Sequence, residues 1–266
     1  MSFTITEDKF LHHCFHKEHH SSIPFEDLVV SVSTCVVYFD ERTNFKIESI
    51  FNSVPVYEKP LEFIEKSDSV QITTVAESGT ILLAKFKNEF RGGVPFATRA
   101  FRNQTTLVMS IDGKNVNIFV FRNCVKITGL KVLNQIVEVL DQFLTIIQRL
   151  HRYCTVYEQE PVVIDYAPCM TNKNFNIGFN IDRERVDKYL LANGHISIFE
   201  PSVNSGVYLK IPRRGIEDKF HTFTIFHTGK ILCSFHGDDN DENKNVYDYV
   251  VDLLLKNDIR KKFIAG

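Results

Sequence analysis

The sequence predicts an α+β protein made of two tandem pseudo-symmetric repeats, each an antiparallel sheet with helices on one face. A strand–turn–strand pattern followed by an amphipathic helix occurs twice along the 266 residues, a length sufficient for two such units. The composition agrees, because 44% hydrophobic and 24% charged residues are typical of globular proteins. The 23 Phe, the 9 Tyr and the many β-branched residues favour strands.

The two strand–turn–strand segments are the clearest sign of the repeat. Residues 118–129 form one segment, with a tight turn at Arg122-Asn123, and residues 223–234 follow the same plan, with Thr228-Gly229 as the hairpin turn. Apolar residues at helical spacing predict an amphipathic helix after each segment, over 133–150 and 246–254. The acidic residues 238–242 directly precede the second of these helices and suit a helix N-terminus.

Each half also contains elements upstream of its hairpin. A strand followed by a short helix opens both halves, and a further strand precedes each hairpin. The predicted segments are strand 29–38, helix 45–51 and strand 105–111, then strand 175–181, helix 183–191 and strand 206–212. Because the helices can cover one face of a sheet only, we expect the opposite face to be solvated or bound to a partner.

These elements predict the domain boundaries. A His-rich extension occupies residues 1–25, the first repeat 26–154, a linker 155–171 and the second repeat 172–266. An insert at about 55–103 expands the first repeat; it contains a predicted strand over 79–87 and a turn at 91–93. Pro161 and Pro168 predict irregular structure in the linker, from Thr155 to Asn174.

Charge and hydropathy exclude several classes of protein. The formal net charge is −2, so any contact with nucleic acid must come from a local patch. No apolar run approaches the ~18 residues that a membrane span needs, and the N-terminus has neither a basic start nor an apolar stretch. We therefore expect a soluble intracellular protein with no membrane partner. The six cysteines include no CxxC pair, which predicts reduced thiols.

The sequence contains no motif typical of an enzyme. GxGxxG, Walker A, HExxH and GxSxG patterns are all missing, so we expect neither catalysis nor a cofactor. The densest group of possible metal ligands is the N-terminal cluster of His12, His13, Cys14, His16, His19 and His20. Its i, i+4 spacings suit Zn²⁺ on a helix, but no second pair at zinc-finger spacing accompanies them, so we expect no metal.

Three segments resemble the TATA-box-binding protein family. Residues 199–211, FEPSVNSGVYLKI, are similar to the second-repeat segment in which an aromatic-Glu-Pro sequence leads through a Gly into a strand. Residues 225–232, IFHTGKIL, resemble the family's Ile-Phe-x-Ser-Gly-Lys hairpin, and in the first half residues 125–131, VKITGLK, resemble its hydrophobic-x-Thr-Gly-Ala-Lys strand end. The likeness extends over most of 26–154 and 172–264. The expanded first half and Phe101-Arg102-Asn103 resemble the divergent TATA-binding-like proteins of large cytoplasmic DNA viruses.

The resemblance implies a curved antiparallel saddle that straddles the minor groove of double-stranded DNA. Members of this family push Phe side chains between base steps and lay small and β-branched residues along the groove floor. The implied role is that of a transcription initiation factor involved in promoter recognition, which recruits a viral RNA polymerase or general transcription factors. The implied location is the host cytoplasm or the virion.

The family's DNA contacts are assigned position by position. Phe226 takes one wedge position, although strand alternation by itself leaves it either exposed or in the core. The other three wedge positions fall on Asn204, Val120 and Gln104, with Phe121 or Phe101 able to substitute after a register shift. The groove-floor pairs become Lys126 with Thr128 and Leu232 with Ser234, and Lys210 keeps a cation for phosphate. The family's central asparagines fall near Val30 and Phe175.

A second role remains open from the sequence. Three of four wedges and both central asparagines are replaced, and the net charge is negative. These replacements favour a protein-interaction or virion scaffold module on a saddle fold that has lost strong DNA binding.

Overall fold

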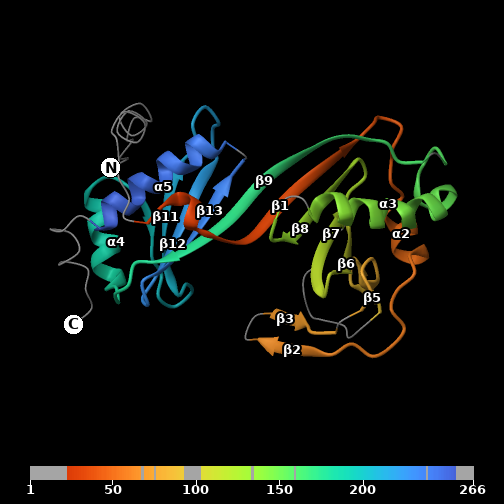
Figure 1. The fold of residues 1–266 in the computed structure, drawn as a ribbon, viewed down its shortest axis with the longest axis horizontal. Helices are drawn as coiled ribbons and strands as arrows, with labels where there is room; N and C mark the ends of the chain where they lie inside the picture. The colour runs from red at the N-terminus through yellow and green to blue at the C-terminus, as the bar shows by residue number, and fades with distance from the viewer. Residues whose placement is uncertain are drawn as a thin grey trace. The chain divides into compact units, whose positions relative to one another are not determined.

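The computed structural model describes residues 23–66, 69–74, 76–92, 103–132, 135–158, 160–237 and 239–255 (Figure 1). The chain divides into two compact units. We call Val32–Pro168 the central unit, and the residues up to Ser31 together with those from Cys169 onward the terminal unit.

The central unit contains an antiparallel sheet with the strand order β9-β1-β8-β7-β6-β4-β5. The strands are β1 (Val29–Phe39), β4 (Ile81–Phe86), β5 (Glu89–Arg91), β6 (Thr105–Ile111), β7 (Lys114–Val120), β8 (Cys124–Leu130) and the first residues of β9 (Val163–Asn176). Helices α2 (Ile47–Ser53) and α3 (Gln135–Cys154) cover one face. Buried Ile118 and Ile127 from the strands pack in one core with Phe143 of α3.

The terminal unit repeats this arrangement with the order β10-β11-β12-β13-β9. Its further elements are η1 (Phe25–Asp27), α4 (Arg183–Ala192), β10 (Ile196–Ile198), β11 (Gly206–Pro212), β12 (Phe220–Phe226), β13 (Lys230–His236) and α5 (Asn240–Leu255). Leu209, Phe223 and Ile231 lie in one core with Val246 and Val250 of α5. The apolar stripe predicted over 246–254 therefore packs on the sheet.

The acidic run before α5 acts at the helix N-terminus. Oδ1 of Asp239 accepts a hydrogen bond from the Glu242 backbone N–H at 2.9 Å. Asp182 has the same role at α4, where its carboxylate accepts from the Arg185 N–H at 3.2 Å. Side-chain acceptors at these positions satisfy backbone donors that the helix leaves without partners.

The α+β class and the antiparallel arrangement with helices on one face are confirmed. The element order is similar in both halves: β1, α2, β4, β6, β7, β8 and α3 against β9, α4, β10, β11, β12, β13 and α5. The predicted strands 105–111 and 206–212 agree with β6 and β11. The strand expected over 79–87 is β4, which is shorter at both ends.

The prediction of irregular structure from 155 to 174 is wrong from Val163 onward, because β9 runs continuously through Pro168. The fixed φ of proline suits extended backbone, so Pro168 removes a donor without ending the strand. The strand predicted over 175–181 is also wrong: β9 ends at Asn176, and Gly178 has a φ of +82°, which leaves the extended region.

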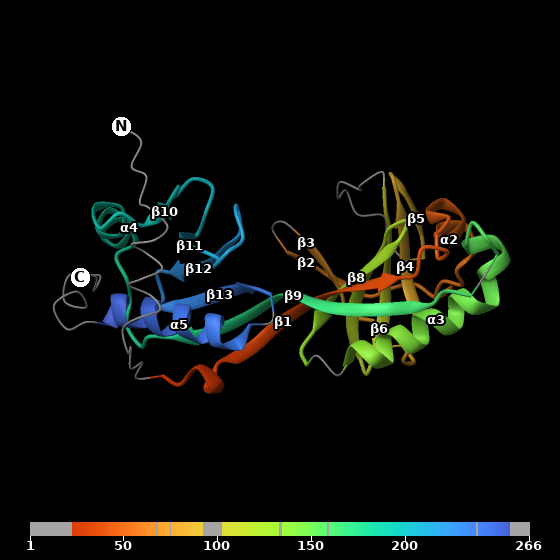
Figure 2. The same cartoon turned by 90° about the horizontal axis from the view of Figure 1, so that it is seen from above.

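The insert covers part of the face that the helices leave open. Its hairpin, β2 (Phe63–Lys66) and β3 (Ser69–Ile72), lies on the side of the central sheet opposite α3 (Figure 2). Buried side chains of the insert and of the sheet form a separate cluster, which contains Leu61, Ile72, Leu82, Leu83 and Val108. Part of the face that was expected to be solvated or partner-bound is therefore covered by the chain itself.

Side chains of the sheet donate two of the hydrogen bonds that hold the insert. The Ser110 hydroxyl donates to the Ala76 carbonyl at 3.0 Å, and Nδ2 of Asn115 donates to the Ile72 carbonyl at 2.7 Å. Of the helices that the structure describes, none is long and apolar enough to cross a membrane. Cys124, Cys154 and Cys233 are free thiols, and burial raises the pKa of Cys154 to about 11.

Candidate nucleic-acid interface

Each unit has a face from which the helices are absent, here called the helix-free face. On β11, β12 and β13 the buried residues alternate with partly exposed ones, so successive side chains point to opposite faces. The helix-free positions line up across the strands, because Lys210 pairs with Thr222, Thr222 with Ser234, and Ser234 with Asn172. A second row contains Tyr208, Thr224, Leu232 and Asn174.

The structure places Phe226 on this helix-free face. Its neighbour on the strand, Ile225, is fully buried in the core, whereas Phe226 is partly exposed. Gly206 lies opposite Phe226 on β11. Strand alternation in the sequence did not determine on which face of the sheet Phe226 lies. The register of β11 and β12 shows that it lies on the helix-free face. The ring is therefore partly accessible from the helix-free face.

The helix-free face of the terminal unit is polar to basic. Nζ of Lys210 lies 5.8 Å from the ring centroid of Phe220 on the same face. The hydroxyl of Tyr208 lies 3.5 Å from Oδ1 of Asn204, the residue predicted at the second wedge position. Asn204 is partly exposed in the turn before β11, so an amide stands where the family has a ring.

In the central unit the equivalent rows cross β1, β8, β7, β6 and β4. Lys126 pairs with Val36 and Phe119, Phe119 with Thr106, and Thr106 with Lys85. The next row contains Thr34, Thr128, Asn117, Val108 and Leu83. The structure thus places Lys126 and Thr128 on the helix-free face of the central unit. Leu232 and Ser234 lie on the helix-free face of the terminal unit.

Six of the strands, three in each unit, together contain lysines but no acidic residue. The structure describes β6, β7, β8, β11, β12 and β13 in full, and their sequences contain no Asp or Glu. They contain four lysines, Lys114, Lys126, Lys210 and Lys230. The net charge of −2 for the chain therefore conceals a locally basic pair of sheets. Counting charges strand by strand would have found this signal in the sequence.

Two predicted wedge positions are wrong. Val120 is fully buried in the core of the central unit, and Gln104 is only 8% exposed, with Nε2 donating to Oγ1 of Thr106 at 3.2 Å. Val120 pairs with Val125, so four residues separate this pair in the β7–β8 hairpin. In the β12–β13 hairpin five residues separate the paired Ile225 and Ile231. This difference turns Val120 inward and makes Phe121 the counterpart of Phe226.

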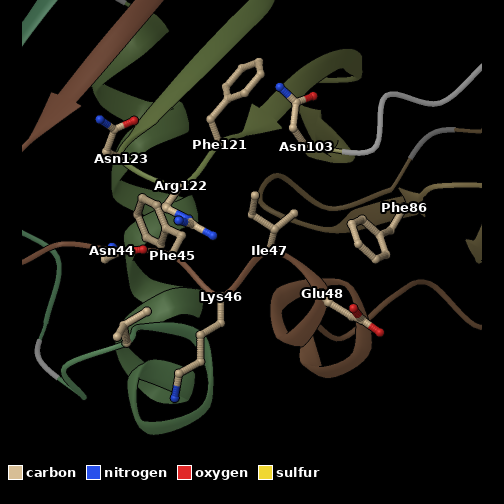
Figure 3. Close-up of a pocket in the computed structure, with 11 residues that line it drawn as sticks. Asn44, Phe45, Lys46, Ile47, Glu48, Phe86, Asn103, Phe121, Arg122 and Asn123 are labelled. Atoms are coloured by element: carbon tan, nitrogen blue, oxygen red, sulfur yellow. The ribbon is translucent and has the colours of Figure 1, made fainter.

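Phe121 borders a pocket of about 810 Å³ in the central unit. In Figure 3, Phe121 and Asn103 lie on one side of this pocket, and Lys46 and Glu48 point away on the other. The remaining lining residues are Asn44, Phe45, Ile47, Phe86, Arg122, Asn123 and Val156. Arg122, at the tip of the hairpin, follows Phe121 directly in the sequence. A ring beside a cation is a combination in which the ring can contact a base and the cation a phosphate.

Sequence reasoning missed two asparagines on β9. Phe175, where a family asparagine was expected to fall, is buried in the core of the terminal unit. Its neighbours Asn172 and Asn174 face the helix-free side. Nδ2 of Asn174 donates to the Val29 carbonyl at 3.3 Å, whereas Oδ1 of Asn172 is buried and has no hydrogen-bond partner among the described residues. The alternation in the run 172–176 is the signal that could have found them.

The candidate metal ligands His12, His13, Cys14, His16, His19 and His20 lie outside the described residues. Within the ranges that the structure does describe, no group of three or more His, Cys, Asp or Glu side chains is arranged to hold a metal ion.

Comparison with known proteins supports the fold. No protein-family model matches the sequence, and no curated protein matches it. Among solved structures, the TBP of Methanococcus jannaschii is similar, with a TM-score of 0.50 and 11% sequence identity over 89% of this chain and 99% of that one. The chain therefore has a TBP-like fold, as the three sequence segments predicted.

Proposed function

We propose that the chain is a DNA-binding transcription initiation factor that contacts the minor groove through its helix-free faces. The observation that carries this proposal is the charge of β6, β7, β8, β11, β12 and β13: four lysines and no acidic residue in a chain whose net charge is −2. Lys126, Lys210 and Lys230 lie on the helix-free faces, because their strand neighbours Val125, Ile211 and Ile231 are fully buried. Such a local excess of cations attracts the phosphate backbone.

The side chains on these faces suit the minor groove. Thr128 and Ser234 are small, and the partly exposed Leu232 adds apolar surface for the groove floor. Phe226 and Phe121 would act as wedges that unstack base steps, at a cost of a few kcal/mol per step. Lys126 and Lys210 would contact phosphates, which fixes position and carries no sequence information.

The proposed partners and setting follow from the sequence resemblance. The helix-covered faces and the turns near Asn204 would recruit RNA polymerase or general transcription factors. The role is one of binding and requires neither catalysis nor a cofactor. The likeness to viral homologues, and with it the host cytoplasm or the virion as location, stays a prediction.

The test is a fluorescence-anisotropy titration of the full chain with random and AT-rich duplexes at two salt concentrations. We expect affinity to fall steeply with salt, because phosphate contacts release counterions. The variants Lys126→Ala and Lys210→Ala should each reduce the slope of log K against log salt by about 1. Lys188→Ala is the matched control, because Lys188 lies on α4, where it pairs with Glu184. Binding that is missing at low salt, or insensitive to salt, would refute the proposal.

A second candidate is a protein-interaction module. The observation that favours it is the insert, which buries Val108 and Ser110 on the helix-free face of the central unit and so shortens the surface left for a duplex. Co-purification with polymerase or factor subunits, combined with no duplex binding at low salt, would select this role.

A further inference from the structure

The hairpin β2–β3 lies on a face of the central sheet and not at its edge (Figure 2). Among the strands that the structure describes, β2 and β3 pair only with each other, so no ladder of backbone hydrogen bonds joins them to the sheet. An isolated two-stranded hairpin is at best marginally stable in water. We call this hairpin, with Leu61 before it and Ala76 after it, the cover.

Side-chain contacts hold the cover on the sheet. Leu61 and Ile72 are its fully packed members in the small cluster with Leu82, Leu83 and Val108, which is separate from the main core of the central unit. The segments of a protein that open most readily are those with few buried apolar contacts. The cover is therefore the part of the central unit that can leave its position without unfolding the rest.

The two ends of the hairpin are tied to each other. The Thr73 N–H donates to the Glu62 carbonyl at 2.8 Å, and the Glu62 N–H donates to Oγ1 of Thr74 at 2.6 Å. These bonds do not involve the sheet, so they persist when the cover moves. They also bring the chain together at the base of the hairpin, where a short linker can replace it.

The cover occupies part of the row that contains Thr128, a residue predicted on the groove floor. Thr128 pairs with Asn117, Asn117 with Val108, and Val108 with Leu83, and the cover packs on the last two. Neighbouring strands are about 4.8 Å apart, so Val108 lies two strands, or about 10 Å, from Thr128. A minor groove is only about 6 Å wide and has a backbone wall on each side. A duplex with its groove over Thr128 would therefore meet the cover.

We infer that the cover is an autoinhibitory element, which occupies the helix-free face of the central unit in the free protein and is displaced when DNA binds. The inference rests on the proposed function. Opening the cover exposes Leu82, Leu83 and Val108 to water, which is unfavourable. A duplex that buries these side chains again compensates for the exposure. The closed and open positions thus form a two-state equilibrium that DNA shifts towards the open one.

The experiment compares duplex affinities of the full chain and two variants in anisotropy titrations with a random duplex at one salt concentration. The first variant has residues 63–72 replaced by Gly-Gly. It should bind about tenfold more tightly, the factor expected when the open position is populated to about 10% in wild type.

The second variant, Asn115→Ala, removes one hydrogen bond of the closed position, the 2.7 Å bond to the Ile72 carbonyl. It should bind about fourfold more tightly, because one such bond changes the opening equilibrium by a factor of about five. If Asn115 served as a DNA contact instead, the substitution would weaken binding, so the sign of the change decides. Ser78→Ala is the matched control: the Ser78 hydroxyl donates to Oε1 of Glu138 on α3 at 3.0 Å, and its loss should leave the affinity unchanged.

Hydrogen exchange follows the cover directly. In the wild-type protein, addition of duplex should quicken exchange of the backbone amides in β2 and β3, because the displaced hairpin loses its packing. Slower exchange there on addition of duplex would overturn the inference, since it would mean that DNA binds with the cover in place.

The outcomes separate the cover from the proposed function. Wild-type binding with a steep salt slope, combined with equal or weaker affinity of the Gly-Gly variant, overturns the cover and leaves the DNA role in place. Lack of duplex binding by both proteins at low salt overturns the two together. Circular-dichroism melting curves test whether the Gly-Gly variant folds. If it does not fold, Asn115→Ala decides alone, and equal or weaker affinity of that variant contradicts the cover.

Discussion

The α-carbon of Gly206 on β11 faces the ring of Phe226 on β12. A Cβ atom added to Gly206 would lie 3.5 Å from Cδ1 of Phe226 and 2.7 Å from Cγ2 of Thr224. The glycine is thus required by the space that its neighbours occupy on the helix-free face. The atoms that exclude a Cβ here are the Thr224 methyl and the Ile225 carbonyl oxygen, the latter at 3.2 Å, whereas 3.5 Å from Phe226 is ordinary contact.

We expect Gly206→Ala to destabilise the terminal unit by about 1–3 kcal/mol, because the new methyl group would overlap the Thr224 methyl. Urea denaturation measures the loss. The double variant Gly206→Ala/Thr224→Ser removes the obstructing methyl and should recover most of the stability, with Thr224→Ser alone as the control. Equal stability of wild type and Gly206→Ala would show that β11 and β12 adjust to the added methyl group with no loss in the free energy of unfolding.

From the register of the β7–β8 hairpin we expect substitutions of Val120 and Phe121 to have opposite effects on stability and on DNA binding. Val120 is fully buried, so Val120→Ala should lower the free energy of unfolding by about 2 kcal/mol and leave the duplex affinity of the folded protein unchanged. Phe121→Ala should weaken duplex binding and cost less stability, because Phe121 is partly exposed. Thermal melts and anisotropy titrations of both variants check this, and the reverse pattern would restore Val120 as the wedge.

Val120 and Phe121 show which features of the fold the sequence could predict and which it could not. Alternation predicted the strands 105–111 and 206–212, because a half-buried strand needs period two. The position-by-position match to the family placed Val120 wrongly, because one residue more or less in a turn exchanges the two faces of a strand, and this depends on which residues pair. The covering of Val108 by Leu61 and Ile72 joins distant parts of the chain, and local patterns carry no signal of it.

Asn115 should control how firmly the insert is held. Its side chain donates to the Ile72 carbonyl at 2.7 Å, at the end of β3. We expect Asn115→Ala to weaken the attachment by about 1 kcal/mol, a typical value for one hydrogen bond, without unfolding the central unit. Hydrogen exchange of Phe63–Ile72 should quicken, while exchange in α3 stays the same. Asn123→Ala at the hairpin tip is the control, and unchanged exchange in the variant would mean that the apolar cluster alone holds the insert.

A buried histidine should make the stability of the terminal unit depend on pH. His221 is fully buried; its Nδ1 accepts from the His236 N–H at 3.3 Å, which leaves the proton on Nε2, 3.3 Å from Oε1 of Glu242. Arg213 lies on the other side of that carboxylate, its Nε 3.6 Å from Oε2. Burial lowers the pKa of His221 below 6.5, and the hydrogen bond with Glu242 opposes this only in part.

Because the pKa of His221 is lower in the folded than in the unfolded protein, the unfolded chain takes up the proton first as the pH falls below about 6.5. The free energy of unfolding should therefore fall between pH 7 and pH 5, by at most about 1.4 kcal/mol per pH unit from this residue. His221→Gln keeps one donor and one acceptor but cannot titrate, so its curve should be flatter over that interval. Parallel curves for His221→Gln and wild type would assign the pH dependence to other groups.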